Sequence, residues 1–151
     1  MSSNKAQKQN PALEPFEILF GEWRTEATHP YMPGETFHGR TSFDRLEGGA
    51  FLIMRQKLDD ARFPEGIAII GSDNEAQKYF MLYFDQRGVS RKYDVSVAGR
   101  QLQWWRDDAA FSQRMVLTMS GDSRTMLGKG EMRKNGGAWE PDIALTYRRI
   151  D

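Results

Sequence analysis

The chain of 151 residues contains no cysteine and only two histidines, His29 and His38. The lack of cysteine excludes disulfides, thiol catalysis and cysteine-ligated metals or iron–sulfur clusters. Lysine plus arginine and aspartate plus glutamate both number 21, so the formal net charge is zero. A phosphate backbone is bound by a basic surface, and we therefore expect no nucleic-acid partner.

Long apolar stretches are missing as well. No segment approaches the roughly 18 apolar residues that a membrane-spanning helix needs. The N-terminal segment also lacks the apolar core of a signal peptide. We therefore expect a cytoplasmic protein with no membrane partner. Residues 1–10 are polar and are predicted to form a flexible tail.

Aromatic residues make up 12%, charged residues 28% and hydrophobic residues 39% of the chain, which is the composition of a globular protein. Its length suits one domain of ordinary size. No internal repeat and no linker interrupts it. Residues 11–151 are therefore predicted to form a single domain.

The segment 11–20 is predicted to form a short helix. Asn10 can cap it, Pro11 suits the first helical position, and Gly21 can end it. Pro15 is unfavourable inside a helix, so the regular part of the helix is expected to begin at Pro15.

After the helix the pattern changes to short alternating segments separated by turn residues. Connections such as Asn135-Gly136-Gly137 are typical of hairpins, which place successive strands antiparallel and side by side. The ten predicted strands cover residues 21–29, 35–46, 50–58, 66–72, 78–85, 89–97, 100–107, 111–119, 123–134 and 138–149.

Ten strands without a second layer of helices must form a sandwich or close on themselves. The unbroken series of hairpins favours closure, because a closed sheet has no exposed edge. We therefore predict an all-β fold, a ten-stranded antiparallel up-and-down β-barrel with a short N-terminal helix. About eight strands give a barrel that its own side chains nearly fill, so ten should leave room for a ligand.

The residues expected inside this barrel are unusual for a core. A plain core favours Leu, Ile and Val, whereas the predicted inner face is rich in methionine, tyrosine and tryptophan, which make an adaptable lining with polar tips. The predicted ligand-binding residues are Met54, Tyr83, Arg91, Tyr93, Trp104, Arg114 and Met115.

The strand pair around residues 90–95 and 103–106 is central to this prediction. In one register Arg91, Tyr93 and Trp104 share the inner face, where an arginine and a tyrosine would hold a carboxylate or another small anion. In the opposite register Arg91 is a surface charge. Arg114 falls on the polar face of its own strand and is the weaker candidate.

The start of the first strand, Gly21-Glu22-Trp23, resembles the calycin superfamily, which includes the lipocalins, the fatty-acid-binding proteins and the nitrobindins. The segment 10–23 is similar to the nitrobindins. Other segments resemble a bacterial lipocalin-like family of unknown function, namely 48–52, 71–73, 79–85 and 145–149.

This resemblance implies roles for particular residues. In lipocalins the tryptophan of the G-x-W motif plugs the barrel floor, and an arginine late in the last strand packs on its ring. Trp23 matches the tryptophan, and Arg148 or Arg149 is placed for the arginine. Fatty-acid-binding proteins hold the acid group of their ligand with an arginine and a tyrosine, which fits Arg91 and Tyr93.

The resemblance does not extend to the haem of nitrobindins, which present an axial histidine on the last strand. Residues 142–149 contain no histidine, and only Tyr147 could ligate haem iron there. His29 and His38 alone do not supply the three or four ligands of a metal site. We therefore predict no cofactor and no metal.

The main functional hypothesis is non-catalytic binding, inside the barrel, of a small, partly apolar ligand that can carry an acid group. One alternative is a small-molecule isomerase or hydrolase in which His38 is the base. Another is a module that pairs barrels into a homodimer through the outward residues Phe80, Leu82 and Phe84.

Overall fold

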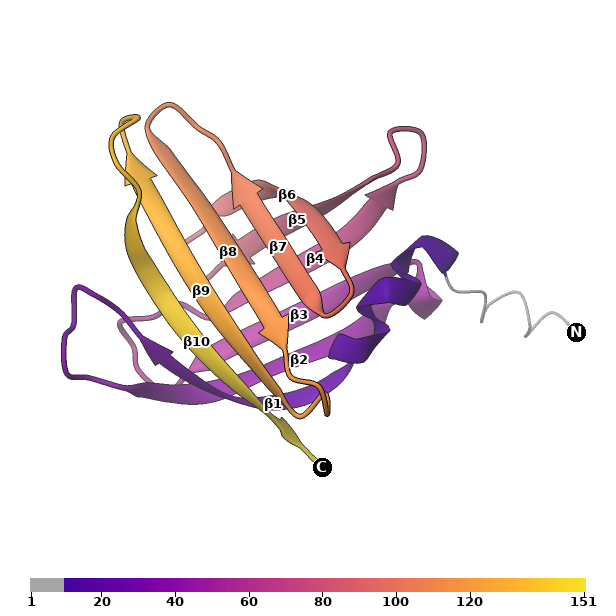
Figure 1. The fold of residues 1–151 in the computed structure, drawn as a ribbon, viewed down its shortest axis with the longest axis horizontal. Coiled ribbons are helices and arrows are strands. Elements are labelled where there is room, and N and C mark those ends of the chain that lie inside the picture. The colour runs from indigo at the N-terminus through magenta and orange to yellow at the C-terminus, as the bar shows by residue number, and fades with distance from the viewer. Residues whose placement is uncertain (1–9) are drawn as a thin grey trace, which may run out of the picture.

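The computed structural model describes residues 10–151 (Figure 1). The predicted tail over residues 1–10 lies outside the described residues except for Asn10. In chain order the elements are η1 (Pro11–Leu19), β1 (Gly21–Thr28), β2 (Phe37–Leu46), η2 (Glu47–Gly49), β3 (Phe51–Leu58), β4 (Gly66–Asp73), β5 (Lys78–Asp85), β6 (Ser90–Ala98), β7 (Gln101–Arg106), β8 (Phe111–Met119), β9 (Thr125–Lys134) and β10 (Glu140–Ile150).

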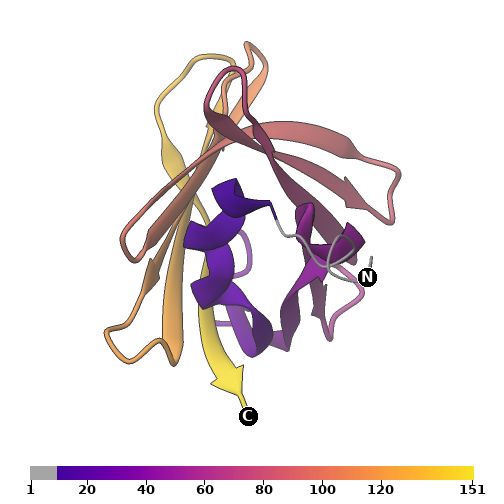
Figure 2. The same ribbon diagram turned by 90° about the vertical axis from the view of Figure 1, so that its right-hand side faces the viewer.

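The ten strands of residues 10–151 form one closed barrel in which each strand pairs with the next along the chain. The ring closes between the first and last strands, which pair antiparallel from Glu22–Ile150 to Thr28–Ala144. The predicted all-β, ten-stranded, up-and-down β-barrel is therefore confirmed. In Figure 2, η1 lies across one end of the barrel.

The N-terminal helix forms where it was predicted, but as a 3₁₀ helix that begins at Pro11 and runs through Pro15. The Asn10 side chain caps it by accepting the N–H of Ala12 at 3.0 Å. The expectation of a regular helix beginning at Pro15 was wrong. A proline ring clashes with the carbonyl four residues back in an α-helix, and here the chain winds in tighter 3₁₀ turns instead.

Trp23 lies in the core at the end of the barrel that η1 covers, and its side chain is fully buried. Its ring N–H donates to the carbonyl of Leu19 at 2.9 Å. The guanidinium of Arg149 lies 4.1 Å from the centre of the tryptophan ring and donates to two carbonyls near the end of η1 at 2.6 and 2.7 Å. Arg148 instead points outward and pairs with Glu26 at 3.1 Å.

β10 contains a bulge between Pro141 and Ala144, where it has one more residue than the facing part of β9. Because of this extra residue, Asp142 and Ile143 both border the inside of the barrel. Gly130 faces the bulge, and a Cβ at this position would lie only 2.8 Å from the carbonyl oxygen of Ile143. The glycine therefore permits the close approach that the bulge requires.

Candidate functional site

The end of the barrel opposite η1 holds a cavity of about 470 Å³, within the range of about 300–1,000 Å³ that is typical of small-molecule sites. Side chains from β3 to β10 and from the adjoining loops line it. All seven residues predicted to bind a ligand lie on this lining, namely Met54, Tyr83, Arg91, Tyr93, Trp104, Arg114 and Met115. Their role in binding stays a prediction.

The register of β6 places Arg91 and Tyr93 on the inner face. Arg91 is opposite Tyr83 of β5, and Val95 is opposite Trp104 of β7. Tyr93 is 6% exposed. This is the register in which the arginine, the tyrosine and the tryptophan share one wall.

Gln113 of β8 is the centre of a hydrogen-bond network on this wall. Its side-chain oxygen accepts from the Tyr93 hydroxyl at 2.7 Å and from Arg91 at 3.2 Å, and its amide nitrogen donates to Asp142 at 3.2 Å. The second oxygen of Asp142 lies 3.1 Å from Nε2 of His29. Burial raises the pKa of Tyr93, which keeps its hydroxyl a donor. The network joins three strands to the β1–β2 loop.

His29 has both ring nitrogens occupied. Nδ1 accepts the backbone N–H of Tyr31 at 3.1 Å, so the proton of the neutral ring is on Nε2 and is donated to Asp142. A general base needs a free lone pair within reach of the proton it removes. This arrangement therefore fixes the β1–β2 loop and leaves His29 no free nitrogen for acid–base chemistry.

Arg91 supplies a positive charge without a close counter-charge. Among residues 10–151, no carboxylate lies within 4.0 Å of its guanidinium, and its hydrogen bond goes to the neutral amide of Gln113. The ring of Phe111 lies 5.5 Å away. A guanidinium has five N–H donors in a planar fork that matches a carboxylate.

Arg114 also borders the cavity, but its charge is already paired. Its Nε donates to Glu131 at 2.8 Å, and its guanidinium lies 3.8 Å from the centre of the Trp139 ring. The arginine and the glutamate side chains are both 44% exposed. Of these two arginines, Arg114 has a carboxylate partner among residues 10–151 and Arg91 has none.

Tyr83 presents its ring to the cavity while its hydroxyl donates to Asp85 at 2.7 Å. Arg87 also binds Asp85 at 2.7 Å. The hydrogen bond from Arg87 lowers the pKa of Asp85, and burial raises the pKa of Tyr83. The three groups hold one another at the rim of the barrel.

Asp85 is expected to make the barrel less stable in acid. The pKa of Asp85 in the folded protein is below its value of about 4 in the unfolded chain. Ionised Asp85 therefore contributes fully to the free energy of unfolding above about pH 4. This contribution is lost as the pH falls through the lower folded-state pKa. Thermal unfolding followed by circular dichroism should show a shallower acid decline in Asp85→Asn than in the wild type. Asp94→Asn, on the outer face of β6, is the control and should keep the wild-type slope. Equal slopes in Asp85→Asn and the wild type would contradict the prediction.

His38 lies on the outer face of β2 and is exposed, opposite Glu26 of β1. Its neighbour Phe37 takes the inner face and is 5% exposed, so strand alternation turns His38 outward. The alternative of an isomerase or hydrolase with His38 as its base therefore finds no support in the structure.

Four polar residues of the cavity lining were not predicted from the sequence, namely His29, Gln56, Gln113 and Asp142. A signal existed for Gln113, which is the polar member of an otherwise apolar alternating face in β8. No such signal existed for His29, which lies in a loop, or for Asp142, which faces inward because of a bulge.

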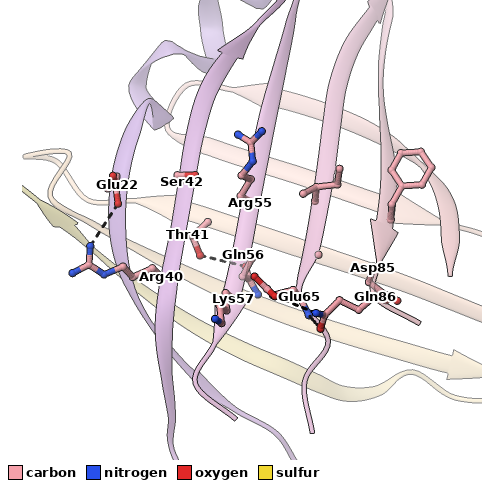
Figure 3. A pocket seen from close by; sticks show the side chains of 13 residues that line it. Glu22, Arg40, Thr41, Ser42, Arg55, Gln56, Lys57, Glu65, Asp85 and Gln86 are labelled. Carbon is pink, nitrogen blue, oxygen red and sulfur yellow. Dashed lines mark hydrogen bonds and ion pairs between the residues drawn. The ribbon is translucent and has the colours of Figure 1, made fainter. Parts of the chain in front are cut away.

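A second hollow of about 550 Å³ lies on the outer surface of β1 to β5 (Figure 3). Its labelled side chains are mostly charged, and Arg40 pairs with Glu22 at 3.7 Å with both side chains more than 60% exposed. Such solvated charges hold a ligand weakly. The inner cavity is therefore the stronger candidate despite its smaller volume.

The outward residues Phe80, Leu82 and Phe84 lie on the outer face of β5 beside Ile67 and Ile69 of β4. Phe84 is 39% exposed. η1 lies across the end of the barrel and leaves this face uncovered (Figure 2). The homodimer through this face stays a prediction.

Within residues 10–151, no group of three or more histidine, aspartate or glutamate residues is arranged to hold a metal ion. In the same part of the chain, no helix has the length and apolar character needed to cross a membrane.

The fold is shared with a protein of known structure. The crystal structure of Rv2717c from M. tuberculosis superimposes with a TM-score of 0.69, over 95% of this chain and 100% of that chain, at 14% sequence identity. No protein-family model and no curated protein matches the sequence. At this identity the likeness shows the fold alone. The fold of this chain is a closed ten-stranded antiparallel barrel, which is consistent with the calycin-like fold expected from the sequence.

Proposed function

We propose that the barrel binds a small, partly apolar molecule with an acid group and performs no chemistry on it. The observation that carries this proposal is Arg91, an inner-wall guanidinium that hydrogen-bonds to an amide rather than to a carboxylate. A ligand carboxylate would complete this contact with charge-assisted hydrogen bonds.

The rest of the lining supports an apolar ligand body. Methionine side chains adapt to different shapes, and aromatic rings offer large rigid surfaces. Four methionines and seven aromatic side chains line the cavity, namely Met54, Met81, Met115, Met132, Tyr31, Phe63, Tyr83, Tyr93, Trp104, Phe111 and Tyr147.

The hydrogen bonds of the polar groups at the cavity support binding without a reaction. The histidine at the cavity has no free nitrogen, and Asp142 is bound through both of its oxygens. Groups held in this way position the wall and are not poised to move a proton.

Two matched probes test the acid preference. 8-Anilinonaphthalene-1-sulfonate carries a negative charge, and N-phenyl-1-naphthylamine has the same rings without it. Arg91→Gln is expected to weaken binding of the sulfonate by about tenfold or more, because a hydrogen bond to a charged group contributes about 1.5–3 kcal/mol. Binding of the uncharged amine should change little. Fluorescence titration measures both affinities.

Arg24→Gln is the matched control, because Arg24 is exposed on β1 and does not line the cavity. It should leave both affinities at their wild-type values. Equal losses for the charged and the uncharged probe in Arg91→Gln, or no loss for either, would overturn the proposal.

A further inference from the structure

A second polar group of the cavity is not used by the proposed acid contact. The side chain of Tyr147 is fully buried and borders the cavity. Among residues 10–151, its hydroxyl has one hydrogen-bond partner, the side-chain oxygen of Gln56, at 3.4 Å. Hydroxyl hydrogen bonds are normally about 2.5–3.0 Å long, so this one is weak.

The side chain of Gln56 also lacks short hydrogen bonds. Its oxygen receives the hydroxyl of Thr41 at 3.5 Å, whereas that hydroxyl lies 2.7 Å from Thr25. Its amide nitrogen donates to no acceptor among residues 10–151. Buried polar groups are nearly always hydrogen-bonded. The hydroxyl of the fully buried Tyr147 is therefore a donor without a close acceptor, and the half-buried Gln56 beside it offers its amide as a second donor.

These donors and the acid contact lie on opposite walls. In the closed ring, Arg91 is on β6, which is three strand positions from β3, the strand of Gln56, and four from β10, the strand of Tyr147. Neighbouring strands are about 4.8 Å apart, so a tilted ring of ten is roughly 15–20 Å across between backbones. Side chains extend inward from both walls, so the distance left between their polar groups is about the length of a small molecule.

Burial raises the pKa of Tyr147, so its phenol stays neutral and keeps its hydrogen to donate. A neutral donor pair suits an uncharged acceptor oxygen, whereas the guanidinium of Arg91 on the other wall suits an anion. The two walls therefore differ in the chemistry that they can recognise.

We infer that the ligand has two different polar ends, an acid group at Arg91 and a neutral hydroxyl, carbonyl or ether oxygen at Tyr147 and Gln56. Its class is an acid with an apolar body and a second, uncharged oxygen at the end away from the acid group. The inference rests on the proposed function, because the acid contact fixes the ligand's other end.

Two pairs of acids of different length test the inference. In each pair one member carries the second oxygen: 4-hydroxybenzoate against benzoate, and 6-hydroxy-2-naphthoate against 2-naphthoate. In at least one pair the hydroxy acid should bind about fivefold more tightly, the effect of one net hydrogen bond. Calorimetric titration of the full chain measures the affinities.

Tyr147→Phe should remove this preference while leaving the affinity for the plain acid unchanged. Tyr79→Phe is the matched control, because its hydroxyl already donates to the carbonyl of Ala12 at 2.6 Å and it does not line the cavity. The control should keep the preference. Circular dichroism checks that both variants fold.

The outcomes separate the two proposals. If the plain acids bind but neither hydroxy acid binds more tightly, the two-ended ligand is overturned and the acid-binding function stands. A preference that persists in folded Tyr147→Phe also overturns it. If none of the four acids binds the wild-type protein, the proposed function fails and this inference fails with it.

Discussion

Replacing Trp23 with alanine is expected to lower the free energy of unfolding by about 3–5 kcal/mol, the usual cost of removing a buried tryptophan. The ring is fully buried, and its N–H bonds to the carbonyl of Leu19 at 2.9 Å. The change also removes the surface on which Arg149 stacks. Urea unfolding followed by circular dichroism measures the loss.

Two further variants show which part of Trp23 contributes. Trp23→Phe keeps an aromatic ring but removes the N–H donor, so it should retain part of the stability. Trp105→Ala removes a tryptophan from the outer face of β7, where it lies opposite Asp94 and Arg114, and should cost far less. A Trp23→Ala protein as stable as Trp105→Ala would show that Trp23 is not a core residue.

The fold could be predicted because its signal is repeated along the chain. Each strand carries its own alternation and each connection its own turn residues, so an error at one hairpin does not change the class of fold. The helix was harder. The cap and the apolar spacing predict a helix from Pro11, whereas Pro15 disfavours an α-helix. The segment forms a 3₁₀ helix, which includes Pro15.

The wall formed by Arg91, Tyr93 and Trp104 could be anticipated because all three lie on strands with unbroken alternation. In a regular strand alternate side chains point to opposite faces, so one residue assigned correctly to the inner face assigns all the others of that strand. The same rule explains the position of His38 on the outside, since Phe37 beside it takes the core face.

The remaining parts of the site depend on contacts that alternation does not encode. Asp142 faces inward because one extra residue shifts the phase of β10, and no turn residue in the sequence marks that shift. Tyr147 and Gln56 meet across strands that are not neighbours in the barrel. Such contacts depend on the three-dimensional closure of the sheet.

Gly130→Ala is expected to lower the free energy of unfolding by about 1–3 kcal/mol, because overpacking forces the backbone to move. The new Cβ would lie 2.8 Å from the carbonyl oxygen of Ile143 and 3.1 Å from the terminal methyl of Met115. The methionine can rotate away, but the carbonyl belongs to the bulge. Relief of the clash therefore displaces Asp142 from Gln113 and His29.

This displacement gives the substitution a second, local effect. The Nε2–H proton of His29, which Asp142 holds at a heavy-atom distance of 3.1 Å in the wild type, should lose its hydrogen-bonded NMR resonance in Gly130→Ala. Gly121→Ala is the matched control, because a Cβ there meets nothing within 4 Å and its backbone is not strained. It should keep both the resonance and the stability. A Gly130→Ala protein with the wild-type resonance and stability would mean that the bulge does not depend on the glycine. Loss of both would show that the position of Asp142 on the cavity wall depends on a residue that carries no side chain.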